Sequence, residues 1–180
     1  MTETDETTLI VVESLFGNTR AVADAIADGL RERSPHQQVR VVAAADPLPP
    51  LQGASLLLLD GPTHAFAMTR NSTREDAVKY GATENPRRGL GDWIKDAAGS
   101  AEDFPGLVVT FDTRIRRIPG SAAASAAKAL RRAGFARVER GESFWVTGTS
   151  GPLADGELDR SHSWGRTMGS RLADTTGRRS

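Results

Sequence analysis

The stretch VVESLFGNTRAVADAIADGL, residues 11–30, decides the fold of this chain. It begins in an apolar run, Leu9–Val12, which is short and β-branched enough to form a buried strand. It ends in apolar residues spaced three and four apart as far as Leu30, which form one face of a helix. Between the two lies SLFGNT, residues 14–19, where hydroxyl groups, an amide and a glycine are crowded together. The stretch predicts a strand that passes through a short polar loop directly into a helix, the unit from which parallel α/β sheets are built.

The composition is that of one ordinary globular domain. The chain has 180 residues, of which 38% are hydrophobic and 26% are charged, enough for a single domain with a full core. Lys plus Arg and Asp plus Glu are equal at 23 each. No overall field therefore attracts nucleic acid or an anionic membrane, and neither is expected as a partner. The acidic, polar N-terminus and the lack of a long apolar run predict a cytoplasmic protein with no membrane span.

The same composition narrows the chemistry. The chain has no cysteine, which excludes disulfides, thiolate catalysis, iron–sulfur clusters and cysteine-based zinc sites. Its three histidines, His36, His64 and His162, are scattered and do not have the spacing of metal ligands. No metal site is therefore predicted.

Apolar periodicity predicts that strands and helices alternate along the chain. Strands are expected at residues 9–12, 39–43, 55–59, 107–111 and 138–146, the last in two pieces. Helices are expected at residues 18–33, 90–98, 121–133 and 155–172. Apolar strands that alternate with helices form a doubly wound parallel sheet with helices on both faces, so the fold class is α/β. The domain is expected to span residues 8–175, between a flexible tail at 1–7 and a frayed end at 176–180.

Ligands of such sheets bind beyond the carboxyl ends of the strands, where three loops of this chain should meet. They are residues 14–19, 60–66 and 112–117. The first loop feeds a helix N-terminus, where unpaired N–H groups and the helix dipole favour an anion. Gly17 lets the backbone approach that anion closely, and no lysine follows it, which favours a monophosphate over a triphosphate. The alternative is that Asn18 or Thr19 merely caps the helix and Gly17 shapes a turn.

The second and third loops carry different chemistry. In DGPTHAFAM, residues 60–68, Thr63, His64 and Phe66 suit the edge and face of a heteroaromatic ring. The alternative is a plain turn with a solvent-facing histidine. In FDTRIRRIPG, residues 111–120, three arginines follow the strand, and a solvated basic loop is the alternative to a ligand-binding role.

The motifs ESLFGNT, GPTHAF and FDTR, each after a strand, resemble the three cofactor loops of the flavodoxin family. The resemblance is to the short-chain type and covers about Thr8 to Leu172. It implies a five-stranded sheet in the order 2-1-3-4-5 with FMN at the point where the strand order reverses, a placement for which flavodoxin itself is the standard example.

The resemblance assigns FMN contacts residue by residue. It implies that the phosphate is held by Ser14, Phe16, Gly17, Asn18 and Thr19. One side of the isoalloxazine ring is then lined by Pro62, Thr63, His64, Ala65 and Phe66. The other side and the ribityl edge contact Asp112, Thr113 and Arg114. The flavin supplies the chemistry, so no residue is assigned as catalytic.

Two features depart from an electron-shuttling flavodoxin. The third loop offers no aromatic side chain after Phe111 to clamp the ring, and the chain is neutral where such flavodoxins are strongly acidic. Arg114, Arg116 and Arg117 would favour the anionic reduced flavin and raise its reduction potential. The expected function is electron transfer to a redox partner protein, or flavin-dependent reduction of a small-molecule acceptor. Some flavodoxin relatives reduce quinones and one oxidises protoporphyrinogen. The resemblance therefore leaves open whether the chain is an enzyme.

Three further hypotheses complete the prediction. A degenerate fold that has lost FMN could serve as a partner-binding module. A receiver-like domain could use Asp60 as a phosphoacceptor, although Glu13 alone supplies a carboxylate at the end of the first strand. The long polar segment from His64 to Arg88, which includes Met68 and Tyr80, is expected to be either a lid over the ring or a disordered insertion.

Overall fold

The computed structural model of the protein describes residues 6–63, 68–79, 81–82 and 87–177. Its strands are β1 (Thr7–Val12), β2 (Gln38–Ala43), β3 (Ala54–Pro62), β4 (Leu107–Ile115) and β5 (Val138–Val146). Its helices are α1 (Asn18–Arg33), α2 (Asn71–Lys79), α3 (Leu90–Ala97), a 3₁₀ turn at Ala98–Ser100, α4 (Ala122–Arg132) and α5 (Glu157–Gly177). The strands form one parallel sheet in the order β2-β1-β3-β4-β5, which confirms the predicted fold class and strand order.

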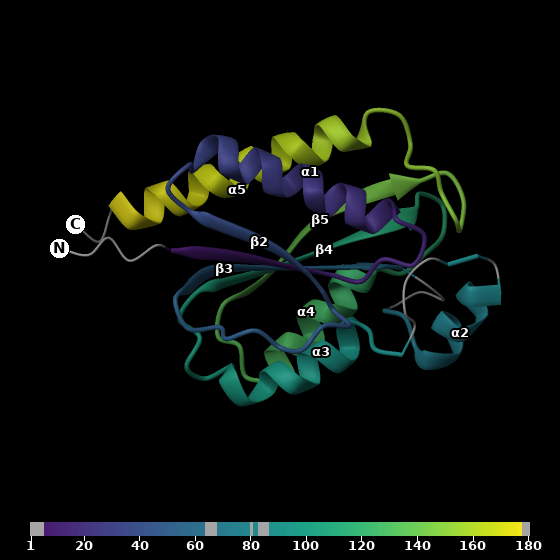
Figure 1. The fold of residues 1–180 in the computed structure, drawn as a ribbon, viewed down its shortest axis with the longest axis horizontal. Coiled ribbons are helices and arrows are strands. Elements are labelled where there is room, and N and C mark those ends of the chain that lie inside the picture. Colours follow the sequence, from purple (N-terminus) through teal and green to yellow (C-terminus); the bar gives the residue numbers. More distant parts are fainter. Residues whose placement is uncertain (1–5, 64–67, 80, 83–86, 178–180) are drawn as a thin grey trace.

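Helices cover both faces of the sheet (Figure 1). Helices α1 and α5 lie on one face and α3 and α4 on the other, while α2 lies beyond the carboxyl ends of the strands. Successive residues of a strand point to opposite faces, so each strand contributes to two cores. In β1, Ile10 and Val12 pack with α1, whereas Leu9 and Val11 pack with α3 and α4. No helix in the described part of the chain is long and apolar enough to cross a membrane.

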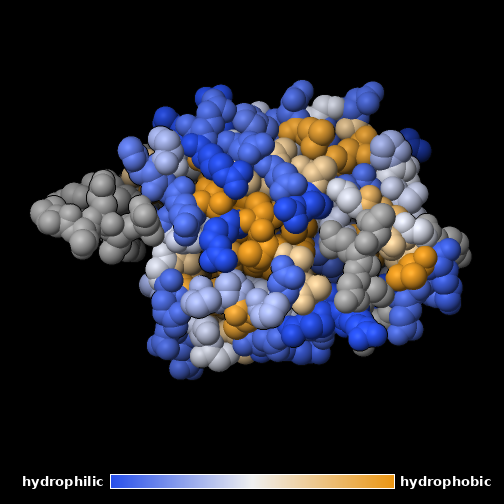
Figure 2. Space-filling view, viewed as in Figure 1, coloured by the Kyte–Doolittle hydropathy of each residue, from blue (hydrophilic) through white to orange (hydrophobic). Residues whose placement is uncertain are grey.

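The edge strand β2 is less completely covered than the others. Its Val41 and Val42 are only partly buried. Figure 2 shows apolar surface over the region that β2 occupies in Figure 1, surrounded by hydrophilic residues.

Helix α2 was not predicted from the sequence. Its residues NSTREDAVK show no apolar periodicity, so the segment from His64 to Arg88 was expected to be a lid or a disordered insertion. The structure places a helix there, and its buried side chains among the described residues are Arg74, which is 2% exposed, and the small Ala77. The helix is therefore anchored mainly by an arginine, which leaves no apolar pattern in the sequence. Met68 packs partly buried against the core, while Phe66 and Tyr80 lie outside the described residues.

The strands β3 and β4 run further than expected. β3 continues to Pro62 and β4 to Ile115, so several residues predicted to be in loops belong to strand ends. The first strand begins at Thr7 and the last helix runs to Gly177. In β5 the register shifts opposite Phe111, within a single strand.

Helices α1 and α5 are in direct backbone contact through two glycines. A Cβ atom at Gly29 would lie 2.1 Å from the carbonyl oxygen of His162. A Cβ atom at Gly165 would lie 2.2 Å from the carbonyl oxygen of Ile26. The two helices can pack this closely only while both positions lack a side chain.

We therefore expect Gly29→Ala to lower the free energy of unfolding by about 1–3 kcal/mol, the usual cost of overpacking a core. Gly91→Ala in α3 is the matched control, because a Cβ atom there meets nothing within 4 Å. That variant should be as stable as the parent or gain up to about 1 kcal/mol from helix propensity. Urea unfolding of the parent and the two variants measures both effects. A Gly29→Ala variant as stable as the parent would contradict the close contact between α1 and α5.

Candidate functional site

A pocket lies at the carboxyl edge of the sheet, where the three predicted loops meet. Its lining residues are Leu15, Phe16, Asn18, Thr19, Pro62, Thr63, Thr113, Arg114, Ile115, Ile118, Val146 and Thr149. Seven of these are among the residues predicted from the sequence. The structure therefore brings the three loops to one site, and it adds the segment that follows β5.

The first loop presents backbone donors at the start of α1. Gly17 is the N-cap residue of α1 and has φ of 85°, a left-handed conformation that favours glycine. The Oγ of Ser14 accepts hydrogen bonds from the N–H groups of Gly17 (3.1 Å) and Arg20 (3.3 Å). Within the described part of the chain, the N–H groups of Phe16, Asn18 and Thr19 have no acceptor. The alternative that Asn18 or Thr19 caps the helix is wrong, because both lie inside its first turn.

Two side chains of this loop are held by other segments. The Oγ1 atoms of Thr19 and Thr113 are 2.8 Å apart and share a hydrogen bond, which joins the first loop to β4. The Nδ2 of Asn18 donates to the carbonyl oxygen of Ser150 at 3.1 Å. The first loop is therefore fixed in place by contacts from across the pocket.

The second loop is described only in part. Pro62 and Thr63 line the pocket, whereas His64, Ala65 and Phe66 lie outside the described residues. Thr63 is also structural, since its Oγ1 accepts from the N–H of Ala122 at 2.9 Å and donates to Asp112 at 3.1 Å. Ring contacts by residues 64–66 stay a prediction.

In the third loop Thr113 and Arg114 line the pocket, but Asp112 does not. Its Oδ2 accepts hydrogen bonds from the Oγ of Ser121 (2.5 Å) and the N–H of Ala123 (3.0 Å), at the N-terminus of α4. Side chains alternate along β4, so Asp112 faces α4 when Thr113 faces the Thr19 hydroxyl of α1. The carboxylate stabilises a helix start, a role that the position in the sequence did not reveal.

Five lining residues were missed: Leu15, Ile115, Ile118, Val146 and Thr149. They are mostly apolar, and the sequence argument searched the loops for polar ligands. The two isoleucines in the third loop were a usable signal, because apolar side chains in a short loop after a buried strand need something to contact. Val146 is the last residue of β5 and Thr149 follows the strand, whose carboxyl end lies at the same edge of the sheet.

Asp60, at the end of β3, is fully buried. It has no exposed surface, and neither carboxyl oxygen has a hydrogen-bond partner among the described residues. Burial raises the pKa of Asp60 well above its ordinary value, the nearby Asp112 raises it further, the backbone N–H of Gly61 lowers it in part, and Glu13 adds a smaller rise. A carboxyl group with no exposed surface cannot be reached by a phosphoryl donor, so the receiver-like hypothesis loses its phosphoacceptor.

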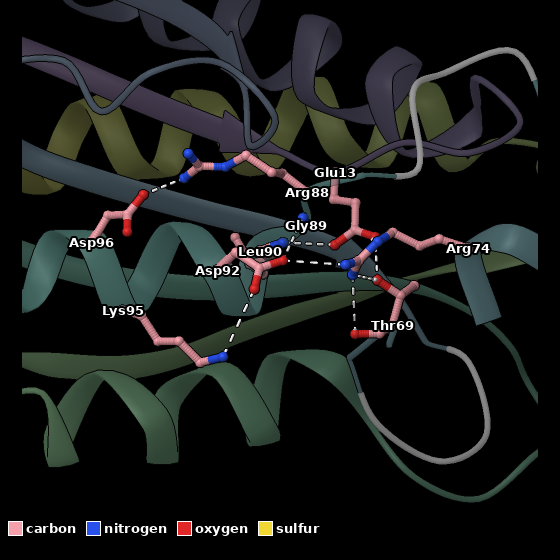
Figure 3. Close-up of polar contacts among 9 residues, drawn as sticks. All are labelled: Glu13, Thr69, Arg74, Arg88, Gly89, Leu90, Asp92, Lys95 and Asp96. Atoms are coloured by element: carbon pink, nitrogen blue, oxygen red, sulfur yellow. Dashed lines mark hydrogen bonds and ion pairs between the residues drawn. The ribbon is translucent and has the colours of Figure 1, made fainter. Parts of the chain in front are cut away.

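A second buried network lies beside the site and holds α2 and α3 to the end of β1 (Figure 3). Glu13, which is 5% exposed, accepts hydrogen bonds from the Thr69 hydroxyl and from the N–H of Leu90 at 2.7 Å. Arg74 Nη1 lies 4.0 Å from Glu13 Oε1, and Arg74 Nη2 donates to Asp92 at 3.1 Å. Burial raises the pKa of Glu13, against the opposing effects of Thr69, Leu90 and Arg74. Removing one partner of such a buried pair costs about 3–5 kcal/mol, so the network fixes α2.

The fold is shared with known proteins although the sequence is not. No protein-family model matches the chain, and no curated protein matches its sequence significantly. A flavodoxin from the domain Archaea aligns with TM-score 0.64 at 17% identity, over 93% of this chain and 99% of that chain. Flavodoxin 2 from Bacillus cereus aligns with TM-score 0.64 at 16% identity, over 92% of this chain and 99% of that chain. The flavodiiron protein from Giardia intestinalis gives TM-score 0.63 at 14% identity, over 93% of this chain and 36% of that chain. The protein therefore has a flavodoxin-like fold.

The raised pKa of Asp60 predicts a pH-dependent stability. The folded state binds this proton more tightly than the unfolded chain, so the parent should lose stability as the pH rises from the ordinary value of 3.8 through the folded pKa. Asp60→Asn keeps the shape without the charge, and we expect it to be more stable than the parent at pH 7 and similar to it at pH 4. Urea unfolding across this range measures the difference, with the exposed Asp103→Asn as a control that should follow the parent. An Asp60→Asn variant that was less stable than the parent at every pH would contradict the assignment.

Proposed function

We propose that the protein binds FMN in this pocket and acts as a redox protein, passing electrons to a partner protein or to a small-molecule acceptor. The observation that carries the proposal is the arrangement of the first loop. A left-handed glycine starts α1, and three backbone N–H groups around it have no acceptor among the described residues. Donors arranged in this way at a helix N-terminus suit a phosphate group.

The residues present fit a phosphate monoester. The N–H groups of Phe16, Asn18 and Thr19 would donate to its oxygens, and the hydroxyl of Ser14 can donate as well, because its oxygen already accepts two backbone bonds. The first turn of α1 contains no acidic residue to repel the anion. The helix dipole adds to the attraction.

The remaining walls fit a flat, partly apolar ring. Pro62 and Thr63 at the end of β3 and Thr113 to Ile115 at the end of the neighbouring β4 line the pocket, together with the apolar Leu15, Ile118 and Val146. When bound, FMN would supply the electron-transfer chemistry, and the protein would orient it and exclude water. A guanidinium group at Arg114, in the pocket wall, favours an anionic reduced flavin.

Structural neighbours support the same reading. They include proteins described as flavodoxins, among them an oxidised flavodoxin from Bacillus cereus and a two-electron reduced flavodoxin from Megasphaera elsdenii. Their identities to this chain are 18% and 16%, so the cofactor is proposed from the site and not from the likeness.

The proposal predicts that FMN binds at least about tenfold more tightly than riboflavin, which is about 1.4 kcal/mol from the phosphate contacts. Gly17→Val should remove this preference, because a β-branched residue at φ of 85° forces the loop out of its present shape. Calorimetric titration of both ligands into the parent and the variant measures the preference.

The matched control is Gly53→Val. Gly53 also has a positive φ, of 80°, and like Gly17 it has open space where a Cβ atom would stand. It precedes β3 at the opposite edge of the sheet, so both variants should lose about 1–2 kcal/mol of stability, and only Gly17→Val should lose FMN. Equal affinity of the parent for FMN and riboflavin would remove the phosphate site, and the absence of flavin binding would leave a partner-binding module without cofactor.

A further inference from the structure

The mouth of the pocket carries positive charge without acidic residues. The segments that form it, residues 14–20, 61–63, 113–120 and 146–154, contain four arginines and no aspartate or glutamate. Arg20 is paired with Asp24 at 3.0 Å. Arg114, Arg116 and Arg117 have no carboxylate partner in the described part of the chain. In a chain with 23 basic and 23 acidic residues, this is a local imbalance.

Two of these charges are held by one aromatic ring. The guanidinium carbons of Arg114 and Arg116 lie 5.1 and 5.2 Å from the centroid of Trp145, within the range of a cation–π contact. Arg114 also donates a hydrogen bond to the carbonyl oxygen of Gly120. These contacts restrict two long side chains before any ligand arrives, so less conformational entropy is lost when a ligand binds.

An apolar surface lies beside the charges. Ile118 is 44% exposed although it lines the pocket, and Ile115 lines the same wall. The pocket and the arginine cluster therefore form one continuous surface, because Arg114 belongs to both. A ligand that contacts the isoleucines places its polar edge among the guanidinium groups.

We infer that Arg114, Arg116, Arg117 and Ile118, here called the cationic rim, bind a small organic anion with carboxylate groups on an apolar or aromatic body. This anion would be the electron acceptor or donor in the proposed redox function, so the inference rests on that function. Guanidinium groups bind carboxylates through paired hydrogen bonds, which gives recognition beyond simple charge. The rim selects a small molecule over an acidic protein because Arg114 is in the pocket wall and Arg116 is held against Trp145.

The test uses benzene-1,3,5-tricarboxylate as the probe and the uncharged benzene-1,3,5-tricarboxamide as its partner of equal shape. Both are titrated by calorimetry into the purified protein, with and without added FMN. We expect the tricarboxylate to bind and the tricarboxamide to bind at least about tenfold more weakly. The variant Arg116→Gln/Arg117→Gln should lose about tenfold in affinity for the tricarboxylate, and added salt should weaken the binding to the parent.

The matched control is Arg132→Gln/Arg137→Gln. Arg132 ends α4 and Arg137 directly precedes β5, both exposed and at the opposite edge of the sheet, and their replacement changes the net charge by the same amount. The control should bind the tricarboxylate like the parent. The inference is wrong if the parent does not bind the tricarboxylate, if both probes bind equally, or if the two double variants lose affinity equally.

The same titrations separate this inference from the FMN proposal. FMN affinity of the parent decides the proposed function, whatever the tricarboxylate does. If Arg116→Gln/Arg117→Gln instead lost affinity for FMN, and the tricarboxylate displaced FMN from the parent, the arginines would belong to the cofactor site and the inference would be overturned. Binding of an acidic protein in place of the tricarboxylate would overturn it as well.

Discussion

The register of the three central strands is the constraint on which the site depends. Val12 of β1 pairs with Asp60 of β3, and Asp60 pairs with Phe111 of β4, so the last row of β1 continues across the other two strands, which run a few residues further. Each chain segment that follows them must then leave the sheet at the same edge. A shift of one residue would turn every side chain of a strand to the other face. The pocket is therefore a consequence of the packing of the sheet, and the loops only supply its chemistry.

A buried acid lies near the carboxyl end of each central strand, and the three acids have different partners. Glu13 is held by Leu90, Thr69 and Arg74, and Asp112 by the start of α4. Asp60 has no partner for either oxygen among the described residues. A buried polar group without a partner lowers the free energy of unfolding, so Asp60 is locally destabilising. Destabilising groups of this kind are found more often at functional sites than elsewhere.

Apolar periodicity predicted all five strands and the helices other than α2, because those elements are anchored by buried apolar faces. The same signal was absent from α2, since its anchor is a buried arginine that pairs with residues far away in the sequence. The first loop was predictable because Gly17 and its polar neighbours act locally. The role of Asp112 was not, because it depends on which side of β4 packs against α4. Residues 64–66, on which the ring contacts were predicted, lie outside the described residues.

Burial also separates the charges of the site. Asp60 and Glu13, at the strand ends, have raised pKa values, so their environment favours the neutral form. Because Arg114 lies in the pocket wall and also in the cationic rim, one guanidinium group acts on both places. The charge that would attract an anionic acceptor is thus the charge that would stabilise an anionic reduced cofactor, and a ligand that neutralised it would weaken that stabilisation. In the proposed function, binding at the rim and the reduction potential of bound FMN would therefore be coupled through Arg114.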